Sequence, residues 1–212
     1  MTTSKKIWNF WSKHYESLWV QGLSLAPTRD NVIRELEAII KDKGKVYSIL
    51  DIGCGTGQLL NQLSQAFGDY EIRLTGLDFS EGMIEEARKK NPAIEFHRMN
   101  VEDLEAKTER YDIVICTHSF PYYQNQEKAI VLMKNMLVKD GILLLAQASA
   151  NSLYDGLAMF LVKITTGKAY YLSVKEMRSI LPVDLYLSKL VRIRTKWFMP
   201  SIYLFLMKKV AG

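Results

Sequence analysis

The sequence predicts an α/β fold in which a mostly parallel sheet is covered by helices on both faces. Strand-like and helix-like segments alternate after residue 45, which is typical of parallel strands joined by crossover helices. An apolar run at residues 46–51 ends in an acid and leads into a turn with glycine at every second position. Late in the chain, residues 190–196 and 201–208 are both strand-like, and the break at Met199–Pro200 between them indicates an antiparallel hairpin.

The individual elements follow from hydrophobic periodicity and from the residues that begin or end helices. Residues 31–41 place apolar side chains on one helical face, with Thr28 or Asp30 as the expected cap. Ser80 is the expected N-cap of a later helix, which Asn91–Pro92 ends. We expect strands at 46–51, 72–78, 94–97, 111–116, 141–146, 190–196 and 201–208, and helices at 31–41, 58–67, 81–90, 127–138 and 173–180.

The length and composition fit one globular domain. A chain of 212 residues can bury a sizeable core, and we expect a single domain over residues 1–212. Hydrophobic residues make up 48% and charged residues 24% of the chain, which argues against disorder. The N-terminus has no apolar run of signal-peptide length, and we find no run of about 18 apolar residues that would span a bilayer. The expected location is the cytoplasm.

The net charge of +5 and the pI near 9.0 raise the question of an anionic partner. Much of the excess lies late in the chain, where basic residues alternate with apolar ones, and this alternation favours a solvated strand face. Nucleic acid or an anionic lipid surface is the alternative partner. Cys54 and Cys116 lie in an expected turn and an expected strand, so we expect buried free thiols and no metal site.

The glycine turn at residues 53–57 is the strongest functional signal. Without side chains at Gly53, Gly55 and Gly57, the turn can adopt positive φ angles and let a ligand lie against bare backbone amides at a helix N-terminus. The spacing is G-x-G-x-G, with an acid two residues earlier, whereas the dinucleotide fingerprint is G-x-G-x-x-G. These residues therefore predict a nucleotide-like ligand that is not a dinucleotide.

The segment Asp51-Ile52-Gly53-Cys54-Gly55-Thr56-Gly57 resembles the first motif of the class I S-adenosylmethionine (SAM)-dependent methyltransferases. That resemblance implies a three-layer, Rossmann-like, seven-stranded sheet with an antiparallel last strand. It also implies SAM as the methyl donor and S-adenosylhomocysteine as the product. The similarity covers roughly Val46 to Ala146, with the terminal hairpin added.

Several residues are then expected to bind the cofactor. Asp51 would lie near the ammonium group of SAM. Asp78 follows Gly57 by 21 residues, close to the offset of about 20 at which an acid binds a ribose hydroxyl. The resemblance places Phe79 and Met83 beside the adenine. Asn100 stands where the family usually has Asp, and its amide can still accept a hydrogen bond from the adenine amine. The full expected set is Asp51, Gly53, Cys54, Gly55, Gly57, Asp78, Phe79, Met83, Asn100, Val101 and Thr117.

Methyl transfer is an in-line displacement, so positioning and exclusion of water can supply most of the catalysis. An acceptor that must lose a proton would need a general base, and His118 is the first candidate because histidine titrates near neutrality. Tyr15 and Tyr122 are further catalytic candidates. A structural, hydrogen-bonded histidine is the alternative for His118.

Two segments outside the common core are expected to select the acceptor. Residues 1–28 are rich in aromatic side chains and form either a lid or a packed helix at the edge of the core. Residues 151–172 follow the fifth strand and form either an apolar cap over the acceptor pocket or a membrane-surface contact. The aromatic residues favour a small-molecule acceptor with an aromatic or apolar portion. The sequence specifies no oligomeric state.

Other functions fit the sequence less well. An NAD(P)-dependent oxidoreductase is disfavoured by the glycine spacing and by the lack of a separate substrate domain. A SAM-binding pseudo-enzyme or an aminopropyltransferase-like relative would keep the fold and lose methyl transfer. A nucleic-acid methyltransferase is disfavoured because residues 118–122 read His-Ser-Phe-Pro-Tyr, without an Asn/Asp-Pro-Pro-aromatic motif.

Overall fold

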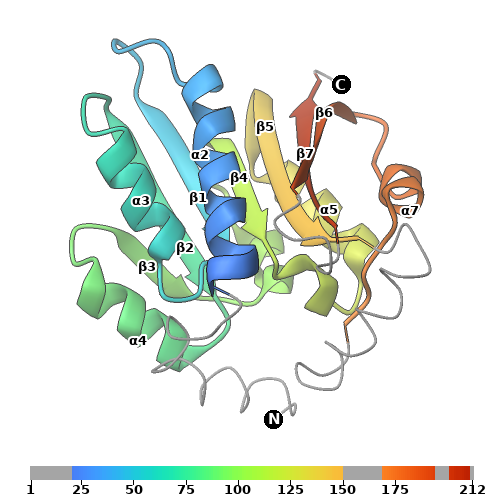
Figure 1. Ribbon diagram of the computed structural model, residues 1–212, viewed down its shortest axis with the longest axis horizontal. Coiled ribbons are helices and arrows are strands. Elements are labelled where there is room, and N and C mark those ends of the chain that lie inside the picture. Colours follow the sequence, from blue (N-terminus) through green and yellow to red (C-terminus); the bar gives the residue numbers. More distant parts are fainter. Residues whose placement is uncertain (1–20, 150–168, 194–200, 211–212) are drawn as a thin grey trace.

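The computed structural model describes residues 21–149, 169–193 and 201–210, and its centre is a twisted sheet of seven strands (Figure 1). Their order in the sheet is β3-β2-β1-β4-β5-β7-β6. Strand β7 is antiparallel to both of its neighbours, and the other pairings are parallel. The strands are β1 (Tyr47–Ile52), β2 (Ile72–Asp78), β3 (Glu95–Arg98), β4 (Tyr111–Thr117), β5 (Leu137–Ala148), β6 (Leu185–Ile193) and β7 (Ile202–Lys209).

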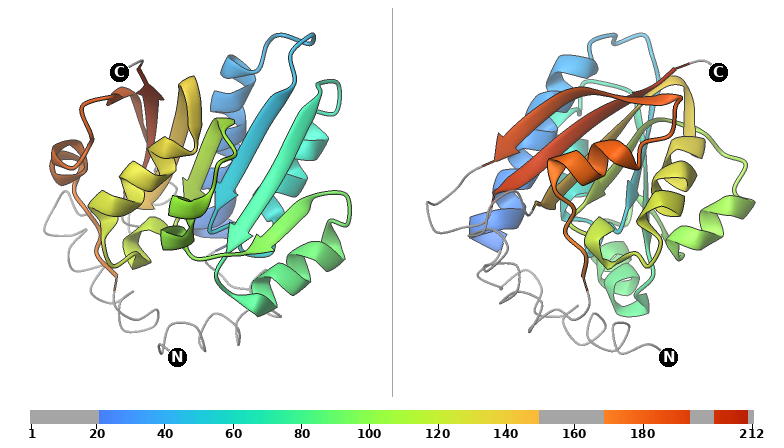
Figure 2. Two further views of the ribbon diagram at one scale, coloured as in Figure 1. Left: turned by 180° about the vertical axis from the view of Figure 1, so that it is seen from behind. Right: turned by 90° about the vertical axis from the view of Figure 1, so that its right-hand side faces the viewer.

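Helices cover both faces of this sheet, so the described part has three layers (Figure 2). Three helices pack on one face: α2 (Ala26–Ile39), α3 (Gln58–Ala66) and α4 (Glu81–Lys90). The other face is covered by α5 (Gln126–Asn135), α7 (Val174–Ser179) and the short 3-10 helix η3 (Val101–Ala106). Two further short elements are the π-helical turn η2 (Gln21–Leu25) and the 3-10 turn η4 (Phe120–Tyr122).

The two layers of core follow from the two-residue period of a strand. Successive side chains of a strand point to opposite faces of the sheet. In β1, Ile49 packs in the cluster beneath α2, α3 and α4, whereas its neighbour Leu50 packs in the cluster beneath α5. Leu144 and Leu145 of β5 divide in the same way. A parallel sheet buried on both faces therefore needs continuous apolar runs, which these strands have.

The predicted architecture is confirmed, with shifts at some boundaries. β2 spans the predicted residues, and Ser80 accepts a hydrogen bond from the Met83 amide as the N-cap of α4. The predicted start of the first helix was wrong: α2 begins at Ala26, before Thr28 and Asp30. Its first turn contains Pro27, and the Thr28 hydroxyl donates to the carbonyl of Ser24 instead of capping the helix.

The C-terminal hairpin pairs β6 with β7 as predicted, but β6 begins at Leu185, five residues before the expected start at 190. Its basic side chains have partners within the chain. Lys189 forms an ion pair with Glu35 at 2.7 Å, and Arg192 donates to the Ser201 hydroxyl. These contacts fit the expected solvated face.

Two expected features lie outside the described residues, namely most of the 1–28 lid and most of the 151–172 insertion. Within the described ranges, no helix combines the length and apolarity needed to cross a membrane. The same residues contain no group of three or more His, Cys, Asp or Glu side chains placed to hold a metal ion.

Candidate functional site

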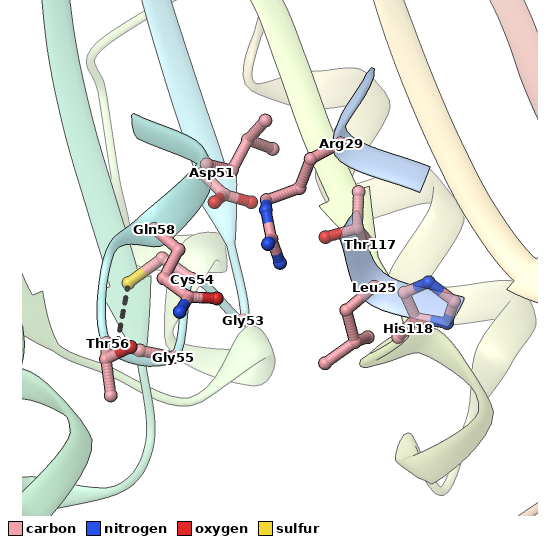
Figure 3. A pocket seen from close by; sticks show the side chains of 11 residues that line it. Leu25, Arg29, Asp51, Gly53, Cys54, Gly55, Thr56, Gln58, Thr117 and His118 are labelled. Atoms are coloured by element: carbon pink, nitrogen blue, oxygen red, sulfur yellow. Dashed lines mark hydrogen bonds between the residues drawn. The ribbon is translucent and has the colours of Figure 1, made fainter. Parts of the chain in front are cut away.

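A pocket lies where β1 and β4 end and where the first turns of α2 approach them (Figure 3). This is the carboxyl edge of the sheet, where ligands bind in open α/β folds. Its lining combines the turn after β1, the residues that end β4 and the start of α2. The lining residues are Leu25, Arg29, Asp51, Gly53, Cys54, Gly55, Thr56, Gln58, Leu59, Thr117 and His118.

The turn between β1 and α3 needs glycine for two separate reasons. Gly53 and Gly57 both have φ of 78°, which is strained for other residues. A Cβ on Gly53 would overlap Oγ and Cβ of Ser119, and one on Gly57 would lie 2.7 Å from Cζ of Phe96. The glycines therefore let the turn pack closely against the loop after β4 and against β3.

The expectation of bare backbone amides in this turn was wrong. The amides of Gly53 and Cys54 donate to the carbonyl of Leu77 at 2.7 and 3.0 Å, and the Gly57 amide donates to the Cys54 carbonyl at 3.0 Å. The Gly55 amide donates to Asp78 Oδ2 at 3.0 Å. These four amides thus bind the protein itself, because the turn curls back over the end of β2.

Asp51 is the most unusual polar group in the pocket. Its side chain is 1% exposed, and its Oδ1 has no hydrogen-bond partner among the described residues. Burial, with a further contribution from the charge of Asp78, raises the pKa of Asp51 to about 7. An orphaned buried acceptor is costly, so the site is built for a group that donates a hydrogen bond.

Asp78 ends β2 next to the turn, and both of its carboxylate oxygens already accept hydrogen bonds. The amide of Ser80 donates to Oδ1 at 2.9 Å, and the amide of Gly55 donates to Oδ2. Burial raises the pKa of Asp78 to about 6, although these hydrogen bonds act in the opposite direction. Each oxygen retains a second lone pair, so the arrangement is compatible with the predicted ribose contact.

The raised pKa of Asp51 predicts a pH-dependent stability. Its folded-state pKa lies above its ordinary value of 3.8, so its contribution is fully favourable below that value and is lost as pH rises to about 7. Relative to Asp51→Asn, we expect the wild-type unfolding free energy to fall by on the order of 2 kcal/mol between pH 4.5 and 7.5. Urea unfolding of wild type and Asp51→Asn measures the two free energies of unfolding. If their difference does not change with pH, the pKa of Asp51 is not raised in the folded protein.

Arg29 and His118 form the side of the pocket opposite the turn (Figure 3). Arg29 extends from α2 into the pocket on the side that Asp51 faces, and its Nε donates to Oε1 of Gln62 on α3. His118 follows β4 with φ of 61°, an uncommon backbone conformation that is concentrated at functional sites.

The hydrogen bonds of His118 indicate its tautomer. Its Nε2 lies 2.9 Å from the Thr28 hydroxyl oxygen, and that hydroxyl donates its only proton to the carbonyl of Ser24. Nε2 must therefore carry the hydrogen and donate it to Thr28. Burial and, secondarily, the positive charge of Arg29 lower the pKa of His118 to about 4, so the ring is neutral at physiological pH.

Only some of the other predicted site residues line the pocket. Thr117 lines the pocket together with Cys54, while Gly57 caps α3 just behind it. Tyr15 lies outside the described residues. The remaining residues are not among the lining residues of the pocket: Phe79 is partly buried after β2, Met83 is buried in α4, Asn100 is exposed before η3, Val101 is buried in the core, and Tyr122 is partly buried in η4.

The segment around Asn100 begins the short helix η3 with a capping arrangement of its own. Asn100 and Asp103 form a reciprocal capping box around the first turn of η3. The Asp103 carboxylate also accepts from the Asn100 side-chain amide at 3.1 Å. The Asp103 carboxylate thus orients Asn100. The contact of Asn100 with adenine stays a prediction.

Two parts of the site were missed from sequence. Arg29 belongs to a helix whose sequence indicated only an apolar face packed against the core. Ser119 joins the turn to the loop after β4, because its hydroxyl donates to the Ile52 carbonyl at 3.0 Å and lies 3.0 Å from the Tyr123 hydroxyl. The small residue after His118 and the tyrosine four positions later were the only available signals for this network.

Comparisons with known proteins match the part of the chain that contributes most of this site. The family model described as "Methyltransferase domain" matches residues 49–141, which include the glycine turn, Asp78 and His118. A malonyl-[acyl-carrier protein] O-methyltransferase of Acetivibrio thermocellus is 32% identical over 110 residues, 51% of this chain and 38% of the relative. The UbiE C-methyltransferase of Campylobacter jejuni is 28% identical over 106 residues, 49% of this chain and 45% of the relative. The aligned segments span less than half the length of these two curated relatives.

Solved structures support the same fold over more of the chain. The N-methyltransferase NodS of Bradyrhizobium japonicum, solved with S-adenosylhomocysteine, gives a TM-score of 0.75 at 16% identity and covers 98% of this chain and 99% of its own. The [4+2]-cyclase SpnF gives a TM-score of 0.68 at 13% identity, covering 86% and 81%. These similarities establish the fold, which methyltransferases share with at least one enzyme named for a different reaction.

Proposed function

We propose that this chain, which carries a class I SAM-dependent methyltransferase domain, transfers the methyl group of SAM to a small-molecule acceptor. The observation that carries the proposal is the pocket at the carboxyl edge of the sheet, where the G-x-G-x-G turn presents Asp51 with an orphaned oxygen. The matching family model and the methyltransferase relatives support the same assignment.

The residues of the pocket fit SAM on chemical grounds. The methionine part of SAM carries an ammonium and a carboxylate, and the pocket offers an acid and a base on opposing sides. Asp51 Oδ1 lacks a donor, which an ammonium would supply through a charge-assisted hydrogen bond. A neighbouring cation would also restore the ionised form of Asp51 by lowering its pKa.

Arg29 would bind the carboxylate of the same moiety. Its guanidinium enters the pocket from α2, and its Nε bond to Gln62 orients it from α3. We expect Arg29→Gln to weaken SAM binding by about tenfold, corresponding to the loss of one charged hydrogen bond. Isothermal titration measures the change.

The matched control is Arg34→Gln, which removes the same charge from an exposed position on the same helix. SAM affinity should be unchanged in that variant. Equal affinities in the two variants would show that the Arg29 side chain takes no part in binding.

Catalysis in this site would rest mainly on positioning. When bound, SAM supplies a methyl group on a sulfonium with a neutral thioether as leaving group. The chain's part is to align the acceptor and exclude water, and buried Leu25 with the first turns of α2 closes one side of the pocket. The His118–Thr28 hydrogen bond ties that helix to the end of β4. We therefore favour a positioning role for His118, because its lowered pKa makes it a weak base.

The second part of the proposal concerns the kind of molecule that accepts the methyl group. The relatives are named for malonyl-acyl-carrier-protein and ubiquinone/menaquinone methylation, and structural neighbours for magnesium protoporphyrin IX and plantazolicin. These names share small-molecule or carrier-bound acceptors and differ in the atom that is methylated. Phe120, which follows β4, is fully buried in the core, so it offers no contact surface to an acceptor. Tyr122 and Tyr123 are only partly buried, and on that basis we propose an acceptor with an apolar or aromatic portion.

Transfer of labelled methyl groups tests the reaction itself. The protein would be incubated with methyl-labelled SAM and a panel of phenolic, carboxylic, amine and thiol acceptors. Label in an acceptor, with release of S-adenosylhomocysteine, supports the proposal. Tight SAM binding with no label in the panel or in a small-molecule cell extract would instead favour a SAM-binding protein with another reaction.

A further inference from the structure

A second concave site lies at the opposite edge of the sheet from the pocket. This groove, here the α5–η3 groove, has a volume of about 310 Å³ and lies between η3, α5 and the end of β7. Arg110, which lines it, directly precedes β4, and Met136 directly precedes β5, so the groove is at the amino edge. A ligand there would not contact the pocket at Thr117 and His118, which follow the other end of β4.

The rim of the α5–η3 groove is basic. Lys107, Arg110, Lys128 and Lys209 line it, and they come from three separate parts of the chain. Two of the lysines have carboxylate partners: Lys128 pairs with Glu105 at 2.9 Å, and Lys107 with Glu109 at 3.3 Å. Half of the basic rim is therefore balanced within the chain.

Arg110 and Lys209 are the unbalanced pair. Among the described residues, no carboxylate lies within 4.0 Å of either cation. Arg110 donates to the carbonyls of Lys107 and Glu109, and Lys209 Nζ donates to the carbonyl of Leu137 at 2.7 Å. These contacts hold both cations at the groove without an ion pair to either of them.

The pKa of Lys209 reflects the other positive charges near the groove. Burial lowers the pKa of Lys209, and the charges of Lys134 and Arg110 lower it further, while Asp184 acts in the opposite direction. Lys134 is itself paired with Asp184 at 2.8 Å, which limits the compensation that Asp184 gives to Lys209. A bound anion would relieve the repulsion between Lys209 and Arg110.

We propose that the α5–η3 groove binds a small phosphate monoester, with the phosphate between Arg110 and Lys209 and the organic part over Val131 and Leu132. A phosphate monoester carries a charge of about −1.5 to −2 at neutral pH, which matches two unbalanced cations better than a carboxylate does. Guanidinium also binds phosphate oxygens in a bidentate geometry. The apolar side chains from α5 give the groove a floor for the ester group.

The test titrates the 212-residue chain with n-butyl phosphate, with inorganic phosphate and butyrate as comparators. Isothermal titration or NMR chemical-shift changes measure the binding. We expect saturable binding of n-butyl phosphate at millimolar concentration or below, and at least about tenfold weaker binding of butyrate. Inorganic phosphate should bind severalfold more weakly than the ester, because it lacks contact with Val131.

Variants locate the site. Arg110→Gln should weaken n-butyl phosphate by about tenfold, whereas Lys89→Gln, which removes an equal charge from exposed α4, should leave it unchanged. Val131→Ser should reduce the preference for the ester over inorganic phosphate. SAM affinity should stay unchanged in Arg110→Gln, so this result is separate from the proposed methyl transfer. No saturation up to about 20 mM, or equal affinities in Arg110→Gln and Lys89→Gln, would overturn the proposal.

Discussion

Replacing Asp51 with Asn should weaken SAM binding by roughly 100-fold at neutral pH, about 2.7 kcal/mol. The substitution preserves the size of the side chain and removes the carboxylate, whose Oδ1 has no hydrogen-bond donor among the described residues. It should also reduce the pH dependence of SAM binding. The pKa of Asp51 is about 7 in the free protein, so wild-type affinity should rise about tenfold from pH 5.5 to 7.0 as the carboxylate ionises. The ammonium of an amino acid remains largely protonated over this range.

Calorimetric titration of SAM at both pH values measures these effects. His118→Gln provides the comparison, because His118 has a pKa of about 4 and should not titrate in this range. The pH dependence should persist in His118→Gln and decrease in Asp51→Asn, where only the smaller contribution of Asp78 remains. If the pH dependence disappears in His118→Gln and persists in Asp51→Asn, our assignment of the titrating group is wrong.

Gly53→Ala should destabilise the protein by about 3 kcal/mol, from steric overlap and a positive φ together. The added Cβ would overlap Ser119, whose hydroxyl already bonds to the Ile52 carbonyl and lies beside the Tyr123 hydroxyl. Neither strand β1 nor the loop after β4 can move without breaking this network. Urea unfolding measures the loss.

A double-mutant cycle separates the overlap from the backbone strain. Ser119→Gly removes the atoms that the new Cβ would meet, so Gly53→Ala should cost only about 1 kcal/mol in that background. The difference between the two costs is the steric part. A cost of Gly53→Ala that is the same in both backgrounds would mean that the turn does not pack against Ser119.

The parts of the structure that could be predicted depend on local sequence. β2 and the N-cap at Ser80 were correctly located because apolar periodicity and capping chemistry act over a few residues. The turn at residues 53–57 was recognisable because its conformation requires glycine. These signals located one side of the pocket.

The other side depends on packing between distant segments. Arg29 lies three residues before Val32 and seven before Leu36, on the face of α2 that packs on the sheet, and it was missed because the helix was expected to begin at residue 31. The Thr28–His118 contact joins residues 90 positions apart. The expectation of free amides in the turn was wrong because three of them donate to the Leu77 carbonyl or the Asp78 carboxylate, which belong to neighbouring strand β2, whose position is set by the register of the sheet.

The central claim is that the pocket binds the cationic cofactor SAM against Asp51. Its most direct test is isothermal titration of the wild-type protein with SAM and with NAD at pH 6.5, in two buffers of different ionisation enthalpy. We expect saturable binding of SAM only, with a buffer-dependent heat that reports proton release as Asp51 ionises. Saturable binding of NAD without SAM binding, or SAM binding with no proton release, would contradict the account.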